Sequence, residues 1–129
     1  MASIKTAIYD LLDNPSVSLE AAVDRHFAPG FRQRVNGHWY GRSEFLERIR
    51  ALRAQLEKLD VRVLDEVTQG NQYAERHVIT LRLHDGQQIV QEVYLFAQRA
   101  HDGRFTSIEE TALSLLAVTS FVVEQQNAK

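Results

Sequence analysis

Two adjacent carboxylates close the stretch "DGRFTSIEET", Asp102 to Thr111. The stretch is typical of a β-strand that follows an Asp-Gly turn, and successive side chains of a strand point to opposite faces. Glu109 and Glu110 therefore point in opposite directions. A carboxyl group in an apolar interior loses hydration, which raises its pKa toward neutrality and suits it to general acid or base catalysis. Strand alternation alone leaves open which of the two faces inward.

A histidine lies on the apolar face of an earlier predicted strand. In "HVITLRL", the positions that alternate from His77 are Ile79, Leu81 and Leu83. Because an imidazole titrates near neutral pH, His77 is a candidate to exchange protons across a pocket or to pair with the buried carboxylate. The alternative is a hydrogen-bonded core histidine without a chemical role.

Three aromatic residues offer flat walls with a polar tip, which suit a small cyclic or aromatic ligand. They are Trp39, Tyr40 and Tyr94, of which Trp39 and Tyr40 are equally well explained as core or dimer contacts. An acid and a base between such walls need no metal and no organic cofactor to remove a proton next to a carbonyl. We therefore expect no cofactor.

The remaining histidines give a weaker signal. His26 ends a predicted helix and is a candidate ligand-binding residue, although a cation there also favours the helix dipole. A metal site of His26, His38 and His77 has no ligand pair at helix or hairpin spacing. We expect no metal.

Composition sets broad limits. The 129 residues fit one domain, 1–129, and a net charge of −2 indicates no nucleic-acid surface. The absence of cysteine excludes disulfides, thiolate metal sites and a cysteine nucleophile. The first residues lack the apolar core of a signal peptide, and no apolar stretch is long enough to span a bilayer. We expect a cytoplasmic protein with no membrane partner.

Helical periodicity is confined to the first half of the chain. It predicts helices over 4–12 and 18–27, with Ser18 as the cap of the second. The clearest pattern predicts a helix capped by Ser43, whose apolar positions run from Phe45 through Leu56 to Leu59.

Beyond Leu59 the period becomes alternating. Four strands are predicted, in "VRVLDEV", "YAERHVITLRL", "QIVQEVYLFAQ" and "RFTSIEE", and a short ribbon precedes them around Asn36-Gly37. Tight turns at Asp85-Gly86 and Asp102-Gly103 favour an antiparallel meander. Helices followed by strands indicate an α+β fold with helices on one face of a curved sheet.

The motifs "HFAPGF", "NGHWYGRSEFLERI" and "EVYLFAQRAHDGRFTSIEE", in this order and spacing, resemble the nuclear transport factor 2-like superfamily. The resemblance covers about residues 5 to 112 and is nearest to the SnoaL-like and ketosteroid isomerase-like proteins. It implies a cone-shaped α+β barrel whose N-terminal helices cover a strongly bent, mainly antiparallel sheet around an apolar pocket. The superfamily includes isomerases, cyclases, dehydratases and non-catalytic binding domains, so the fold leaves the reaction open.

The resemblance also implies which residues face the pocket. Aligning "GRFTSIEET" on the corresponding SnoaL-like strand places Glu110 inward as the catalytic acid, unless a bulge exchanges it with Glu109. Alternation in "QEVYLFAQ" fits either face, and the family's closing pattern favours Glu92, Tyr94 and Phe96 inward. A structural alternative pairs Glu110 with an arginine such as Arg34 or Arg76, and Glu92 has a structural or exposed alternative of its own.

The chain departs from ketosteroid isomerases at both of their carboxylates. The first region reads Arg34-Val35-Asn36, and the second reads Tyr94-Leu95 with Glu92 displaced. Steroid isomerisation by that mechanism is therefore not expected. Two functions remain: a cofactor-free isomerase, cyclase or dehydratase acting on a small apolar carbonyl or polyketide-like compound, and a non-catalytic module that binds a small hydrophobic ligand or a peptide.

The resemblance implies a homodimer, because members of the superfamily are commonly dimers. A bent sheet also has an outer face that must be solvated or paired, and "YLFAQ" and the apolar tail offer pairing surface. We expect 113–123 to contribute to the interface or to lie beside it.

Overall fold

Three helices precede most of the sheet in the computed structural model, which describes residues 3–115. They are α1 (Ile4–Leu12), α2 (Leu19–His26) and α3 (Arg42–Gln55). The side chains of Ser3 and Ser18 accept hydrogen bonds from backbone N–H groups three residues later, at 3.2 and 3.1 Å. These serines satisfy N–H groups that have no partner inside the helix, so the predicted cap of α2 is confirmed.

The strands form one mixed sheet in the order β2-β1-β6-β5-β4-β3. Their bounds are β1 (Phe27–Val35), β2 (His38–Gly41), β3 (Leu56–Gln69), β4 (Gln72–Leu83), β5 (Gln88–Arg99) and β6 (Phe105–Ser114). The predicted antiparallel meander is confirmed from β3 to β6. β1 lies parallel to β6, a pairing that brings a strand from the first third of the chain beside the last described one.

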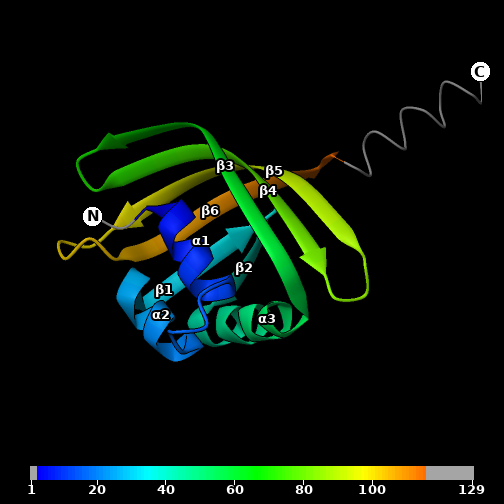
Figure 1. Cartoon of the computed structure of the whole chain (residues 1–129). Helices are drawn as coiled ribbons and strands as arrows, with labels where there is room; N and C mark the ends of the chain where they lie inside the picture. The colour runs from blue at the N-terminus through cyan, green and yellow to red at the C-terminus, as the bar shows by residue number, and fades with distance from the viewer. Residues whose placement is uncertain (1–2, 116–129) are drawn as a thin grey trace, which may run out of the picture.

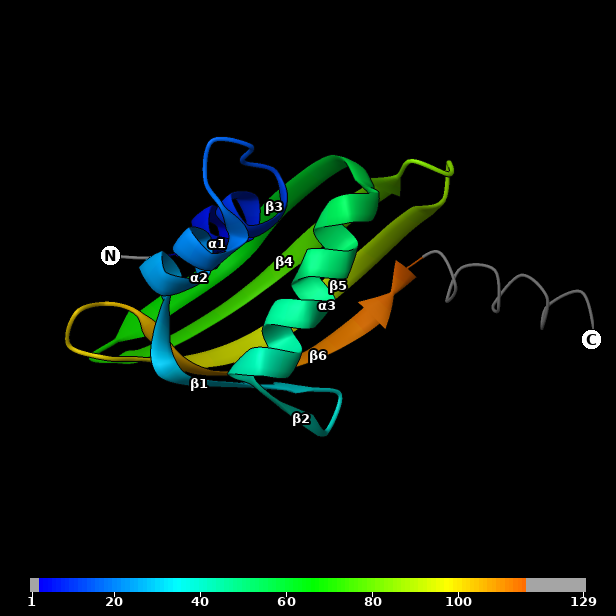
Figure 2. The same ribbon diagram turned by 90° about the horizontal axis from the view of Figure 1, so that it is seen from below.

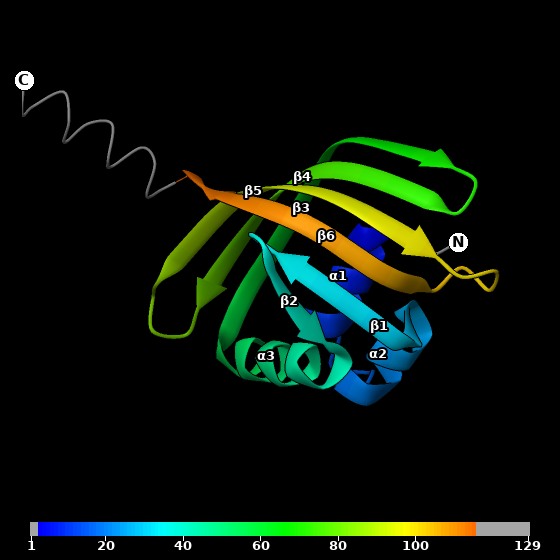
Figure 3. The same cartoon turned by 180° about the vertical axis from the view of Figure 1, so that it is seen from behind.

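The helices lie on the concave face of the sheet, as the predicted α+β cone requires (Figure 1). Seen from below, α3 crosses the strands and α1 and α2 lie beside it (Figure 2). The opposite view shows β1 between β2 and β6 (Figure 3). One apolar core fills the space between these layers, and its most completely buried large side chains are Phe31, Phe105, Val23 and Val61.

The third helix is shorter than its apolar pattern predicts. It ends at Gln55, and Leu56 and Leu59 lie in β3, where they pair with Leu83 and Leu81 of β4. Pairing with β4 satisfies the backbone of these residues as well as a helix does and buries Leu59 in the core. The predicted cap is also wrong by two residues, since the helix starts at Arg42 after Gly41.

The short ribbon turns where the sequence predicts. Asn36 and Gly37 both have positive φ, 48° and 88°, which a tight turn between β1 and β2 requires and which Asn and Gly tolerate best. Part of the expected dimer segment, 116–123, lies outside the described residues. Within the described part of the chain, no helix is long and apolar enough to cross a membrane.

Two leucines of β3 test this assignment of the core. Leu59 is buried, whereas Leu64 is about one-third exposed where a shift in register between Val63 and Asp65 interrupts the pairing with β4. We expect Leu59→Ala to lower the free energy of unfolding by about 2–5 kcal/mol because it leaves a cavity. Leu64→Ala, the matched control, should cost less than half as much. Equal losses in urea denaturation would contradict the assignment.

Candidate active site

A cavity lies between the helices and the concave face of the sheet. Its volume is about 180 Å³, and it is lined by α1, by α3 and by the inward side chains of β1, β4, β5 and β6. The lining is apolar except for four side chains: Gln33, His77, Gln91 and Glu110. An apolar cavity with a few convergent polar groups is the usual form of a small-molecule site.

Glu110 faces this cavity, as expected from the sequence. It pairs directly with Leu95 of β5, and directly opposed residues share one face of a sheet. Leu95 is buried against the helices, so the same face carries Glu110 inward. The turn residue Asn36 stabilises this register: its N–H donates to the carbonyl of Glu110 at 3.0 Å, and its side-chain oxygen accepts from the N–H of Ala112 at 3.0 Å.

The surroundings of Glu110 favour its protonated form. Burial at the cavity wall raises the pKa of the Glu110 carboxyl, although a hydrogen bond from Gln33 acts in the opposite direction. Gln33 Nε2 donates to Glu110 Oε1 at 2.5 Å, which fixes the carboxyl from the β1 side. Desolvation is the larger effect, so Glu110 is a group that holds its proton nearer to neutral pH than an exposed glutamate does.

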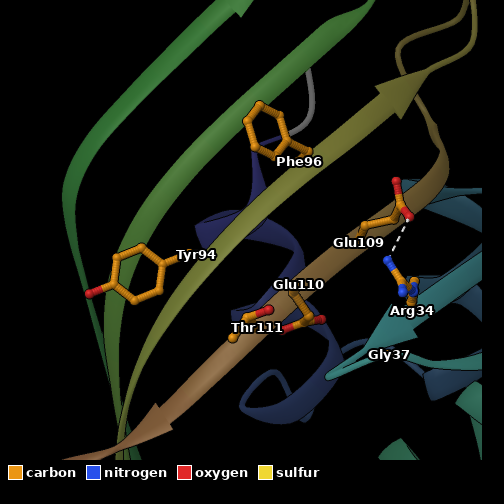
Figure 4. A pocket seen from close by; sticks show the side chains of 7 residues that line it. All are labelled: Arg34, Gly37, Tyr94, Phe96, Glu109, Glu110 and Thr111. Atoms are coloured by element: carbon orange, nitrogen blue, oxygen red, sulfur yellow. Dashed lines mark ion pairs between the residues drawn. The ribbon is translucent and has the colours of Figure 1, made fainter.

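Glu109 lies on the outer face instead. Its carboxylate is half-exposed and lies 3.6 Å from Arg34 Nη1. Figure 4 shows this pair on one side of the sheet, with Tyr94 and Phe96 on the same side and Glu110 across β6. Arg34, Glu109, Tyr94 and Phe96 line a broad hollow of about 410 Å³ on the outer face of β1, β5 and β6, and the lining of this hollow also includes Glu110 and Thr111. Arg34 therefore pairs with Glu109 rather than with Glu110.

His77 lies on the same inner face as Glu110, on the next strand but one. Its Nδ1 is 2.5 Å from Glu75 Oε2, and Glu75 Oε1 accepts from the Tyr73 hydroxyl at 2.5 Å. All three side chains are buried. The Tyr73 hydroxyl also lies 2.8 Å from Glu66 Oε2, and burial together with the two carboxylates raises the pKa of this phenol.

Two residues of this arrangement are missing from the predicted site. Glu75 precedes His77 by two positions, so strand alternation places both on one face and provides a signal for the pair. Gln33 lies in β1, beside β6 only because of the parallel pairing that joins Gln33 to Ile108. No local pattern in "FRQRVNG" indicates that contact.

Three predicted pocket residues of β5 are on the wrong face. Tyr94 is 42% exposed and Phe96 72% exposed, while Val93, Leu95 and Ala97 are buried. Glu92 alternates with Tyr94 and Phe96 along the strand and therefore lies on the outer face as well. Its carboxylate accepts a hydrogen bond from the Tyr94 hydroxyl. The aliphatic set faces the helices because it pairs directly with buried residues of β4, namely His77, Glu75 and Tyr73. The prediction from the family pattern is one residue out of register.

The aromatic residues of β2 also lie outside the cavity lining. Trp39 is 40% exposed and lies under the guanidinium of Arg32, 4.4 Å from its ring centre. The Tyr40 ring is covered in the same way by Arg48 of α3, at 4.2 Å. β2 is an edge strand beyond β1, which keeps both rings away from β4 and β5. Neither is a wall of the inner cavity.

His26 joins two helices rather than lining the cavity. Its Nε2 lies 2.6 Å from Asp10 Oδ2 of α1, and this hydrogen bond holds the pKa of Asp10 below its usual range. This hydrogen bond connects α1 to α2. Among residues 3–115, no group of three or more His, Cys, Asp or Glu side chains is placed to hold a metal ion, so His26, His38 and His77 do not form a cluster.

The arrangement combines an acid and an imidazole in one apolar chamber. Glu110 and His77 lie on β6 and β4, and the strand between them, β5, contributes Val93 and Leu95 to the floor. Two strand spacings place the backbones of β4 and β6 about 10 Å apart. A flat molecule above β5 therefore has a proton acceptor or donor on each side.

Comparison with protein-family models and with curated proteins finds no match. Solved structures do match. A putative hydroxylase, AclR, from Streptomyces galilaeus has a TM-score of 0.68 at 10% identity, covering 90% of this chain and 82% of its own. A putative isomerase from Rhodopseudomonas palustris has a TM-score of 0.68 at 14% identity, covering 84% of each chain.

A third similar structure is described by its fold. It is an NTF2-like protein of unknown function from Exiguobacterium sp. 255-15, with a TM-score of 0.66 at 16% identity, covering 86% of this chain and 98% of its own. At these identities the likeness concerns the fold. The predicted resemblance is confirmed at that level.

Glu110 and Glu109 give a matched test of the site's electrostatics. A carboxyl whose pKa is raised on folding contributes stability that is complete below its unfolded value, near 4.5, and is lost as the pH rises through the folded pKa. We expect Glu110→Gln to remove this loss, so that its stability relative to the wild type increases with pH. The increase should be about 1.4 kcal/mol for each tenfold gain in proton affinity that folding gives the carboxyl. Urea denaturation between pH 4 and pH 8 measures the difference.

Glu109→Gln is the control, because its exposed ion pair is expected to contribute less than about 1 kcal/mol. A stability difference between wild type and Glu110→Gln that stays constant across this pH range would contradict the raised pKa.

Proposed function

We propose that this chain, which has the nuclear transport factor 2-like fold, is a cofactor-independent acid/base enzyme of the isomerase, cyclase or dehydratase type. One observation carries the proposal: Glu110 and His77 line the same apolar cavity. An ionisable group in such a wall costs stability, because desolvation penalises its charged form. A site that only holds an apolar ligand needs neither group.

The cavity limits the substrate to a small molecule. A cavity of 150 Å³ lined by apolar side chains is large enough for benzene. The cavity here, about 180 Å³, therefore suits a compound with a single ring and a carbonyl group. A polyketide-like substrate with several fused rings exceeds this volume, so the proposed substrate is a one-ring carbonyl compound.

The chemistry is proton transfer next to the carbonyl. One of the two groups takes a proton from the carbon beside the carbonyl, and the electron pair of that C–H bond moves toward the oxygen. The other group stabilises the oxygen by donating a hydrogen bond or a proton to it. Return of a proton to a different carbon completes an isomerisation, and loss of a hydroxyl group as water completes a dehydration.

The alternative is a module that binds a hydrophobic ligand without turnover. The observation in its favour is the lining itself, in which α1, α3 and the sheet contribute mostly aliphatic side chains. A solved protein with a ketosteroid isomerase-like fold, from Catenulispora acidiphila, is in complex with trimethylamine. It has a TM-score of 0.60 at 15% identity and covers 81% of this chain and 78% of its own.

We also infer that the chain forms a homodimer through the outer face of its sheet. This face exposes apolar side chains from β3, β5 and β6, namely Val67, Tyr94, Phe96 and Leu113. Large apolar groups gathered on one face of a soluble protein commonly mark an interaction surface. A second copy of the same face would cover them.

Deuterium exchange tests the enzyme without knowledge of its natural substrate. We expect the protein to speed the replacement of α-hydrogens of one-ring ketones, such as cyclopentanone and cyclohexanone, by deuterium in D₂O, followed by proton NMR. Glu110→Gln and His77→Gln should each lower this rate about 10²-fold or more, because each removes a proton-transfer group.

Glu109→Gln and His38→Gln are the matched controls, since both residues are exposed and lie outside the cavity lining. Binding of a ketone would be seen as shifts of the NMR resonances of cavity residues. If the ketones bind but exchange their hydrogens no faster than in buffer, the result would contradict the enzyme proposal and favour the binding module.

Light scattering tests the dimer at micromolar concentration. Phe96→Glu places a charge in the apolar surface and is expected to give a monomer. Gln88→Glu adds the same charge to the opposite end of β5, on the same face, and should leave the dimer intact. A monomeric wild type, or equal effects of both substitutions, would show that this face is not the interface.

A further inference from the structure

We propose that Glu75 is a positioning residue that makes His77 the base of the cavity and leaves Glu110 as the acid. The inference rests on the proposed function and assigns each group its direction of proton transfer. It starts from a series of hydrogen-bonded side chains that runs from the exposed Glu66 through the buried Tyr73 and Glu75 to His77 at the cavity.

The first contacts are the hydrogen bonds that hold Glu75. Its Oε1 accepts from the Tyr73 hydroxyl at 2.5 Å, and its Oε2 lies 2.5 Å from His77 Nδ1. The Tyr73 hydroxyl is also 2.8 Å from Glu66 Oε2, so its single hydrogen lies between two carboxylates. Both oxygens of Glu75 are therefore engaged, which fixes this carboxylate against the imidazole.

The Glu75 carboxylate determines which nitrogen of the imidazole carries the hydrogen. A carboxylate only accepts hydrogen bonds, so the hydrogen between Glu75 Oε2 and His77 Nδ1 belongs on Nδ1. In a neutral ring the other nitrogen, Nε2, then carries the lone pair.

The other ring nitrogen, Nε2, forms no hydrogen bond with any side chain or backbone group in the described part of the chain, and His77 lines the cavity. The lone pair is therefore available to a ligand. On the other side of the β5 floor, burial raises the pKa of Glu110, which favours the protonated carboxyl.

These assignments give a balanced reaction. His77 Nε2 accepts the proton from the carbon beside the carbonyl, the electron pair forms the enol double bond, and the Glu110 proton moves to the carbonyl oxygen. The carboxylate of Glu75 accepts from Nδ1–H and stabilises the imidazolium. Return of the enol proton to Glu110 and of the Nε2 proton to carbon restores both groups, and no oxidant or reductant takes part.

The experiment reads the tautomer of His77 by ¹⁵N NMR in the ligand-free protein at pH 7 to 8. We expect the wild type to hold the hydrogen on Nδ1. Glu75→Gln should mix the two tautomers, because an amide can accept from Nδ1 or donate to it. The same variant should lower the ketone exchange rate roughly 10²-fold or more, since loss of the orienting carboxylate in a Ser-His-Asp triad costs about 10⁴.

Glu66→Gln is the control, because Glu66 is exposed and lies at the end of this series of side chains that is farthest from the cavity. It should leave the His77 tautomer unchanged. A hydrogen on Nε2 in the wild type, or a His77 tautomer that is the same in Glu75→Gln, overturns the proposal. Either result leaves the proposed function standing if the wild type still exchanges ketone hydrogens, so the two can fail separately.

Discussion

The pairing of β6 with a neighbour on each side is the constraint on which the site depends. β5 fixes the parity of β6 by pairing Leu95 with Glu110, and β1 holds it from the other edge through Val35 and the two hydrogen bonds of Asn36. A slip of one residue would exchange Glu109 with Glu110 and place an exposed ion-pair partner in the cavity. The backbone register of β6 therefore determines which of the two carboxyl groups, Glu109 or Glu110, lies in the cavity.

A sheet suits this purpose because strand pairing fixes the position and the face from which each side chain leaves the backbone. Gln33, Glu75, His77 and Glu110 all project from strands that have a neighbour on both edges, while the helices supply the apolar cover. Burial then acts on groups whose positions are already determined. It penalises the charged form of Glu110, and it brings Tyr73, Glu75 and His77 into one hydrogen-bonded chain.

The outer face of the sheet is built from the same strands, but the helices do not cover it. Its charged groups are paired near solvent, as in Arg34 with Glu109 and Arg76 with Asp65, and such pairs add little to stability. Its aromatic residues, Tyr94 and Phe96, are the ones that a pattern-based assignment places inside. Both faces of β5 carry apolar side chains, so alternation along that strand does not indicate which face is buried.

The sequence by itself determined the elements whose signals are local. Ser18 caps α2, Asn36-Gly37 turns the ribbon, and alternation from His77 puts the imidazole inward, because each depends on neighbours within a few residues. The tertiary structure alone decided the end of α3 at Gln55, the outward direction of Tyr94 and Phe96, and the contact between Gln33 and Glu110. These features depend on which strand lies beside which, and residues 33 and 110 become neighbours only when β1 pairs with β6.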